Sequence, residues 1–322
     1  MTSSFKVACS TDCWRAKPND SASSPPTYEQ ILAEMSLVGF QGVELTTSLQ
    51  ESLYHDSTLL NARNLHAASA LYATRLVKED FPNERQRLEQ HLKWLKTHGV
   101  KTILFHEETE AVYKTSRPLS QRPTLERDQW QHLCHGLDSL DAVAKSYEVN
   151  AAYLPRIGSI IQSENDIDRL MNMTSSLGLA LDTGQLVCAG VNNKRLVERH
   201  ATRIRHVRLS NVSYATLHEQ LSQDVSYPAA VAAGSFTVPG ENGPDDTDGL
   251  DYLPVIEALL QANYSNWFVI AGQQLPHSGP SITYVRLGFY AVMYLLHKAQ
   301  RTLAASACSK RQPKEEQLHA PF

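Results

Sequence analysis

Short β-type stretches alternate with longer stretches of helical periodicity along most of this chain, and this alternation limits the folds open to it. In the helical stretches apolar residues recur at i, i+1, i+4 and i+7, as Ile31, Leu32, Met35 and Val38 do. Strands that alternate with helices build a parallel sheet, because each parallel pair needs a long crossover connection. The predicted strands are Phe5–Cys9, Gly42–Leu45, His66–Leu71, Thr102–His106, Asn150–Leu154, Gly178–Asp182, Ile204–Leu209 and Trp267–Ala271. The predicted helices are Tyr28–Val38, Asn83–His98, Leu125–Tyr147, Glu164–Thr174, Asn193–Ala201, Leu250–Ala262 and Ser281–Ala299.

Residues at the helix ends fit this division of the chain. Asn83 and Thr124 are predicted N-caps, since their side chains accept hydrogen bonds from the free N–H groups of a first turn. Gly39 and Gly99 follow helical stretches, where a left-handed C-cap favours glycine.

Eight βα units predict one α/β domain, a single (β/α)8 TIM barrel. The 322 residues would also suffice for two domains, but no glycine-rich phosphate loop follows an early strand, so a dinucleotide-binding sheet has little support. The barrel is expected to take residues 1–301, with a long irregular loop at about 211–249 over the carboxyl end of the strands. Residues 302–322 are polar and are predicted to form a disordered tail.

The composition narrows the class of partner. With 42% hydrophobic residues, 20% charged residues and a net charge of −4, the chain is too apolar for a disordered protein and too weakly charged for a nucleic-acid or membrane-surface binder. Five scattered cysteines and no signal peptide favour reduced thiols in the cytoplasm. We therefore expect a small-molecule partner, no nucleic acid and no membrane, with self-association left open.

Eight motifs occur in an order that resembles a known family. They are GFQGVEL (39–45), PLSQRPTL (118–125), YLPRIGS (153–159), DIDRLM (166–171), LALDTGQ (179–185), HVRLSNV (206–212), FTVPGENG (236–243) and NWFVIAGQQ (266–274). Together they resemble inosose dehydratase, of the xylose-isomerase-like TIM barrels, over almost the whole chain. The resemblance implies the same barrel and leads one to expect a metal-dependent dehydration.

The chain departs from that family where the family binds its metal. A His-rich run is replaced by Leu154, Pro155 and Arg156, and the His of Asp-Thr-Gly-His is replaced by Gln185. Arg208 stands in a His-Val-His-Leu-Lys-Asp motif, and Ala271 replaces the Glu that ends the last strand. Arginine is always charged and has no acceptor, so it repels a cation. We therefore predict no metal and no cofactor.

The candidate catalytic residues are Arg208, Arg156, Asp182, Glu107 and His106. Each ends or follows a strand, at the end of the barrel where active sites lie. Arg156 and Arg208 are predicted to converge on Asp182, either to bind an anionic oxygen or to fill the former metal cavity. Glu107 and His106 are candidate acids or bases. The alternative for Glu107 is a solvated rim charge, and for His106 it is a rim histidine with a satisfied hydrogen bond.

The candidate substrate-binding residues are Glu44, Trp14, Tyr153, Gln185, Phe236 and Gln273. The alternative for Glu44 is a solvated charge, and for each aromatic residue it is ordinary core packing. His206 lies two residues before Arg208 and is expected to share its face, deeper in the barrel, in a structural role.

Three functions follow from these observations. The first is a divergent, metal-independent lyase, isomerase or cyclase acting on a small organic substrate, such as an intermediate of secondary metabolism. The second is a pseudoenzyme that binds a metabolite or a protein, and the third is a metal-dependent inosose dehydratase-like enzyme. Because a barrel hosts many chemistries, the fold does not choose among them.

Overall fold

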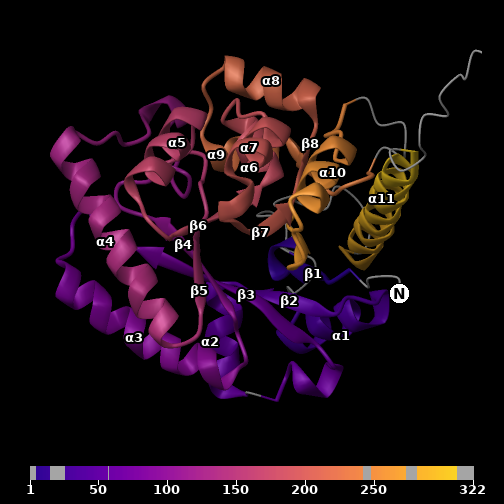
Figure 1. Ribbon diagram of the computed structural model, residues 1–322, viewed down its shortest axis with the longest axis horizontal. Helices are drawn as coiled ribbons and strands as arrows, with labels where there is room; N and C mark the ends of the chain where they lie inside the picture. The colour runs from indigo at the N-terminus through magenta and orange to yellow at the C-terminus, as the bar shows by residue number, and fades with distance from the viewer. Residues whose placement is uncertain (1–4, 15–25, 57, 242–247, 273–280, 310–322) are drawn as a thin grey trace, which may run out of the picture.

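The computed structural model describes residues 5–14, 26–56, 58–241, 248–272 and 281–309. Eight parallel strands close into a barrel in the order β1-β10-β7-β6-β5-β4-β3-β2, and helices surround it (Figure 1). The strands are β1 (Val7–Ser10), β2 (Gly42–Leu45), β3 (His66–Thr74), β4 (Thr102–Glu107), β5 (Asn150–Tyr153), β6 (Gly178–Asp182), β7 (Ile204–Leu209) and β10 (Phe268–Ile270). All eight lie where the alternation predicts a strand.

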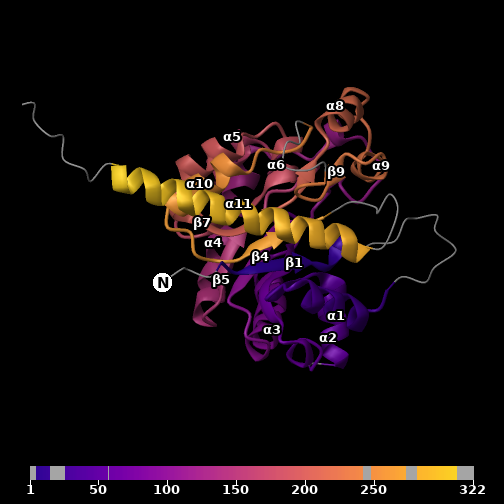
Figure 2. The ribbon, with the colours of Figure 1, turned by 90° about the vertical axis from the view of Figure 1, so that its right-hand side faces the viewer.

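The helices cover the outside of the barrel. They are α1 (Tyr28–Val38), α2 (Thr47–His55), α3 (Phe81–Thr97), α4 (Arg127–Ser146), α5 (Glu164–Met173), α6 (Thr183–Cys188), α7 (Asn193–His200), α8 (Tyr214–Ser222), α9 (Tyr227–Ala232), α10 (Leu253–Gln261) and α11 (Ser281–Ser309). The last of these lies across the side of the barrel in front of β1 (Figure 2). None of the helices in the described ranges is long and apolar enough to cross a membrane.

Both predicted N-caps are wrong, whereas Gly39 is a left-handed C-cap at φ 105°. The N-cap of α3 is Asp80, whose carboxylate accepts the N–H of Asn83, because the helix begins earlier with a proline in its first turn. The N-cap of α4 is Glu126, which forms a capping box with Gln129.

The boundary of the predicted tail is also wrong. Residues 302–309 continue α11. Leu303 in this part of the helix lines the groove between α11, α10 and β1. The rest of the predicted tail, 310–322, lies outside the described residues.

The segment predicted as an irregular loop at 211–249 is largely folded. It contains α8, α9 and a two-stranded antiparallel ladder of β8 (Asn211–Val212) and β9 (Phe236–Thr237). A second hydrophobic cluster forms there from four loops at the carboxyl end of the barrel. Its buried members are Val112, Tyr113, Leu119, Ile157, Cys188, Val212, Leu217, Tyr227 and Phe236.

Side chains alternate between two cores along each strand. Phe105 and Tyr153 face outward and pack under the helices, whereas Leu104 and Ala152 face inward and pack with Leu71, Leu154 and Ala180 inside the barrel. The alternation inside the barrel decides which polar residues can meet at its mouth.

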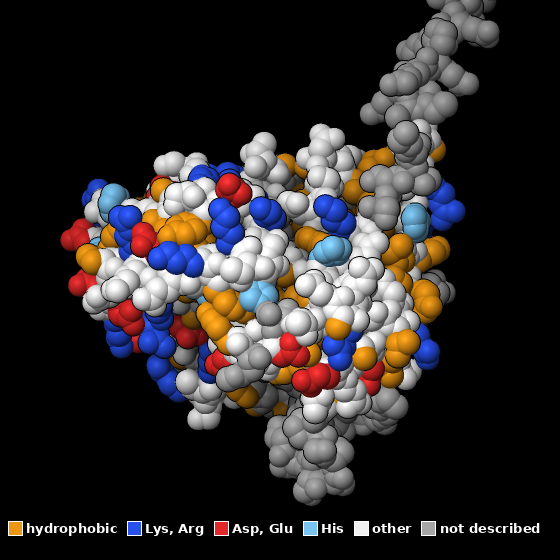
Figure 3. Space-filling view, turned by 90° about the horizontal axis from the view of Figure 1, so that it is seen from below, with side chains coloured by type: hydrophobic (Ala, Val, Ile, Leu, Met, Phe, Trp, Pro, Cys, Tyr) orange, Lys and Arg blue, Asp and Glu red, His pale blue; other side chains and the backbone are white. Residues whose placement is uncertain are grey.

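On the face of the molecule shown in Figure 3, positively and negatively charged side chains lie interspersed.

Candidate active site at the carboxyl end of the barrel

Arg208 is the largest of the fully buried side chains, with 1% of its surface exposed. It faces into the barrel from β7 and pairs in register with Asp182 of β6. Its Nη1 lies 2.6 Å from Oδ2 of Asp182, and its Nε lies 3.0 Å from Oε1 of Glu44 on β2. A single guanidinium therefore joins two buried carboxylates from different strands.

This ion-pair cluster fixes the charges of its members. Burial alone would disfavour ionised Glu44, but the charge of Arg208 and hydrogen bonds from His206 and Ser69 hold its pKa at about 2. Burial also opposes the charge of Arg208, and the two carboxylates outweigh it and raise its pKa above the ordinary value. Glu44 is thus part of the charge cluster. The alternative prediction, that Glu44 is a solvated charge at the rim of the barrel, is wrong.

His206 lies deeper in the barrel, as its spacing from Arg208 predicts. Its Nε2 lies 3.3 Å from Oε2 of Glu44 and 3.3 Å from the hydroxyl of Ser69. The Ser69 hydroxyl in turn donates to Oε2 of Glu44 over 3.1 Å. These contacts hold Glu44 in position, which supports a structural role for His206.

Asp182 also orders the loops beside it. Its Oδ1 accepts the N–H of Gln185 over 3.3 Å, which caps α6, and accepts the hydroxyl of Ser210. That hydroxyl receives the N–H of Gly184 over 2.8 Å. Asp182 therefore uses one oxygen to orient Arg208 and the other to fix the start of α6.

His106 faces the same interior from β4, with 5% of its surface exposed. Its Nε2 lies 3.5 Å from Oε1 of Glu108, an oxygen that also accepts the hydroxyl of Tyr113 and the ammonium of Lys114. Its Nδ1 is buried and has no hydrogen-bond partner among the described residues. Burial lowers the pKa of His106 to about 4, against the opposing effect of Glu108, so the imidazole is neutral at pH 7.

Arg156 does not converge on Asp182, and that prediction is wrong. Strand β5 ends at Tyr153, so Arg156 lies beyond the strand and the strand no longer sets the direction of its side chain. Its guanidinium instead lies over the ring of Tyr113, 4.6 Å from the centroid. It stays close enough to His106 to disfavour a positive charge there.

Glu107 points away from the mouth, so its predicted catalytic role is wrong. It follows His106 on β4 and therefore faces the outer core. Its Oε2 accepts the hydroxyl of Thr74 over 2.8 Å and the N–H of Leu76 over 3.0 Å, and its Oε1 accepts the N–H of Thr109 over 3.0 Å. Burial raises its pKa against these hydrogen bonds. Glu107 fastens two loops to the barrel.

Tyr153 and Trp14 are buried core residues, which agrees with the core packing given as the alternative for each. Tyr153 faces outward from β5, and its hydroxyl accepts the N–H of Glu107 over 3.3 Å. Trp14 ends a short 3-10 helix (Thr11–Trp14) and donates its indole N–H to Oε2 of Glu34 on α1 over 2.6 Å. Both aromatic rings belong to the outer hydrophobic core.

Gln185 and Phe236 lie in the loop cluster beside the mouth. Gln185 accepts the N–H of Ile157 and donates to the hydroxyl of Tyr227, so both ends of its amide are occupied. Phe236 packs edge-on against the ring of Tyr227, with centroids 5.3 Å apart. The remaining predicted substrate contact, Gln273, lies outside the described residues.

Sequence reasoning missed Ser69, Ser210 and Tyr227. Ser210 lies two residues after Arg208, so the same alternation that placed Arg208 in the barrel could have found it. Tyr227 comes from α9, in the segment predicted as irregular, and no local pattern points to it.

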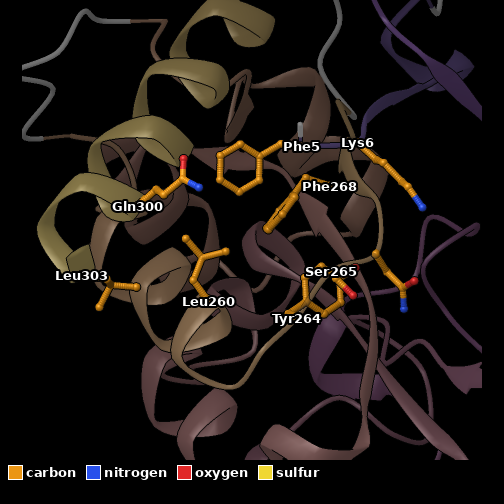
Figure 4. A pocket seen from close by; sticks show the side chains of 9 residues that line it. Phe5, Lys6, Leu260, Tyr264, Ser265, Phe268, Gln300 and Leu303 are labelled. Carbon is orange, nitrogen blue, oxygen red and sulfur yellow. The ribbon is translucent and has the colours of Figure 1, made fainter. Parts of the chain in front are cut away.

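Two cavities lie at the opposite end of the barrel from this site. The one in Figure 4 has a volume of about 270 Å³ and lies between β1, β10, α10 and α11. The other, of about 290 Å³, lies beside the end of α1 and the start of β3. Neither contains a residue of the charge cluster, and TIM-barrel enzymes place their chemistry at the carboxyl end.

The chain matches the family model described as xylose isomerase-like TIM barrel over residues 32–281. It belongs to this family. It is 32% identical over 254 residues to inosose dehydratase of Geobacillus thermodenitrificans, covering 78% of this chain and 83% of that one. It is 28% identical to the rhizopine catabolism protein MocC of Rhizobium meliloti, covering 88% and 86%. A solved structure of the IOLI protein with a bound zinc atom superposes with a TM-score of 0.66 at 15% identity, covering 92% and 99%.

The resemblance to inosose dehydratase leads one to expect a metal at this mouth, but the residues present do not fit one. Arg208 places a guanidinium 2.6 Å from Asp182, and a cation would have to share that carboxylate with it. Ala271, where the family has a ligand, offers no side-chain donor. Across the described ranges, no three His, Cys, Asp or Glu side chains come together in a group able to hold a metal ion.

Replacing Arg208 alone leaves two buried carboxylates without a cation. We expect Arg208→Met to lower the free energy of unfolding by about 3–5 kcal/mol. Adding Glu44→Gln and Asp182→Asn removes the stranded charges and recovers most of that loss. Urea unfolding at pH 7 measures both. An Arg208→Met protein as stable as the wild type contradicts this account of the cluster.

The neutral, buried His106 makes stability depend on pH. An unfolded chain protonates this imidazole below about pH 6.5, whereas the folded protein keeps it neutral down to about pH 4. The contribution of His106 to the free energy of unfolding is therefore complete above pH 6.5 and declines by about 3 kcal/mol as the pH falls to 4. His106→Asn should flatten this part of the stability curve, whereas His132→Asn, on the exposed face of α4, should not. Identical slopes for both variants and the wild type contradict the assignment.

Proposed function

We propose that this chain is a metal-independent lyase, isomerase or cyclase that binds a carbonyl or carboxylate oxygen of a small organic molecule through Arg208. One observation carries the proposal. Arg208 is 1% exposed, is held by Asp182 and Glu44, and keeps Nη2 without a hydrogen-bond partner among the described residues. A buried donor without a partner costs free energy unless a ligand satisfies it.

A fixed guanidinium can supply the electrostatic part of a metal's role. It is always charged, and its two carboxylates orient it before substrate arrives. Donors that are already oriented stabilise the negative charge that develops on oxygen as a bond breaks or a double bond shifts. Arg208 therefore suits elimination or isomerisation next to a carbonyl group.

His106 is the residue best suited to move a proton. When its Nε2 donates to Glu108, its Nδ1 carries a buried lone pair that has no hydrogen-bond partner among the described residues. The neutral state at pH 7 makes it a base, and Glu108 stabilises the imidazolium that results. Asp182 is engaged with Arg208 and Ser210, which leaves it less suited to the task.

The substrate we propose is less polar than a sugar. Leu154 and Ala271 are fully or almost fully buried where the resemblance leads one to expect polar ligands. Apolar walls favour a substrate with fewer hydroxyl groups, such as an intermediate of secondary metabolism. The relatives named inosose dehydratase support a cyclic ketone as the class to test first.

The test is turnover of cyclic α-hydroxyketones, from 2-keto-myo-inositol to 2-hydroxycyclohexanone, with EDTA or with added Mn²⁺. We expect turnover that EDTA leaves unchanged and that falls about 100-fold or more in Arg208→Lys and in His106→Asn. The matched control is Glu107→Gln, a neighbouring buried carboxyl that faces the other way. Turnover that requires Mn²⁺ contradicts the proposal, and binding without turnover favours the pseudoenzyme.

A further inference from the structure

The side-chain amide of Gln185 has a fixed orientation. The N–H of Ile157 donates over 3.0 Å to one end of this amide, so that end must be the oxygen. The other end is therefore the NH₂ group, which lies 2.7 Å from the hydroxyl of Tyr227. In this hydrogen bond the amide donates and the Tyr227 oxygen accepts.

A hydroxyl that accepts this bond still has its own proton to donate. No acceptor for the Tyr227 O–H occurs among the described residues, although the side chain is buried, with 5% exposed. Burial raises the pKa of this phenol well above its ordinary value, so it stays protonated and remains a donor at physiological pH.

Tyr227 is joined to the charge cluster through Gln185, whose amide donates to the Tyr227 hydroxyl and whose N–H donates to Asp182. It is the first residue of α9, and its ring is held by Phe236 in the loop cluster. Its hydroxyl is close enough to Arg156, Asp182 and Arg208 for their charges to act on it. The segment after β7 thus brings a neutral donor to the mouth, where the charges of both guanidinium groups act on it.

Arg156 adds unused donors on the same side. Its guanidinium rests on the ring of Tyr113, and its N–H groups make no hydrogen bond to the described residues. Stacking on an aromatic face leaves the edge of a guanidinium open for planar oxygen pairs.

We propose that Tyr227 is a second hydrogen-bond donor to the substrate oxygen that Arg208 binds. With Arg156 beside it, the site takes a planar pair of neighbouring oxygens, as in a carboxylate or an enediolate. This inference rests on the proposed function, because it places a second contact on the same substrate group.

The test compares Tyr227→Phe with two matched variants by calorimetric titration. Tyr264→Phe removes a buried hydroxyl that donates to the carbonyl of Trp267 at the other end of the barrel. Tyr252→Phe removes a buried hydroxyl that donates over 2.9 Å to the carbonyl of Ser210, beside the charge cluster. The probes are cyclohexanecarboxylate, a carboxylate without ring hydroxyl groups, and 2-hydroxycyclohexanone, an α-hydroxyketone that forms an enediolate. The probe whose binding depends on Tyr227 identifies the source of the oxygen pair.

We expect Tyr227→Phe to weaken binding of at least one probe about 10-fold or more, with Tyr264→Phe and Tyr252→Phe within about threefold of the wild type. Binding unchanged in Tyr227→Phe overturns this inference and leaves the proposed function standing. Equal loss in Tyr227→Phe and Tyr252→Phe also overturns it, because it assigns the hydroxyl a structural role. A wild type that binds neither probe overturns the proposed function together with this inference.

Discussion

The ion pairs of Arg208 with Asp182 and Glu44 organise this barrel from the inside. Three charges buried at 1% exposure or less are costly unless each has a partner, so the three side chains must be held together. They come from β7, β6 and β2, and the guanidinium crosses the barrel interior to reach the last of these. His206 and Ser69 hold Glu44, and Ser210 holds Asp182, so most polar residues of the interior serve one cation.

This arrangement changes what the mouth can do chemically. A metal ion exchanges its ligands and polarises an oxygen from an open coordination site, whereas Arg208 offers a fixed charge and an Nη2 group without a hydrogen-bond partner among the described residues. Around it the structure places a neutral imidazole at His106 and a neutral phenol at Tyr227. The site therefore combines an anchored positive charge with a buried imidazole and a buried phenol that are both uncharged at pH 7.

The barrel could be predicted from the sequence because its two periodicities are local. The same alternation placed Arg208 and Asp182 correctly, since both lie within strands and their parity fixes the side that they face. The prediction that Glu107 lies at the mouth is wrong because side chains alternate along a strand, so the adjacent residues His106 and Glu107 cannot both face inward. The prediction that Arg156 converges on Asp182 is wrong because Arg156 follows the last residue of its strand, where the strand no longer sets the direction of its side chain. Tyr227 depends on how a folded segment packs over the mouth, and no local pattern encodes that packing.

In the function proposed above, the Arg208 guanidinium takes the place of a metal ion. Calorimetric titration of the purified chain with Mn²⁺ tests it most directly, before any substrate is known. The account predicts no binding up to millimolar Mn²⁺ for the wild type, and recovered binding when Arg208→His and Ala271→Glu together return the ligand types that the family resemblance implies. Stoichiometric binding of Mn²⁺ by the wild type at micromolar concentration would contradict it.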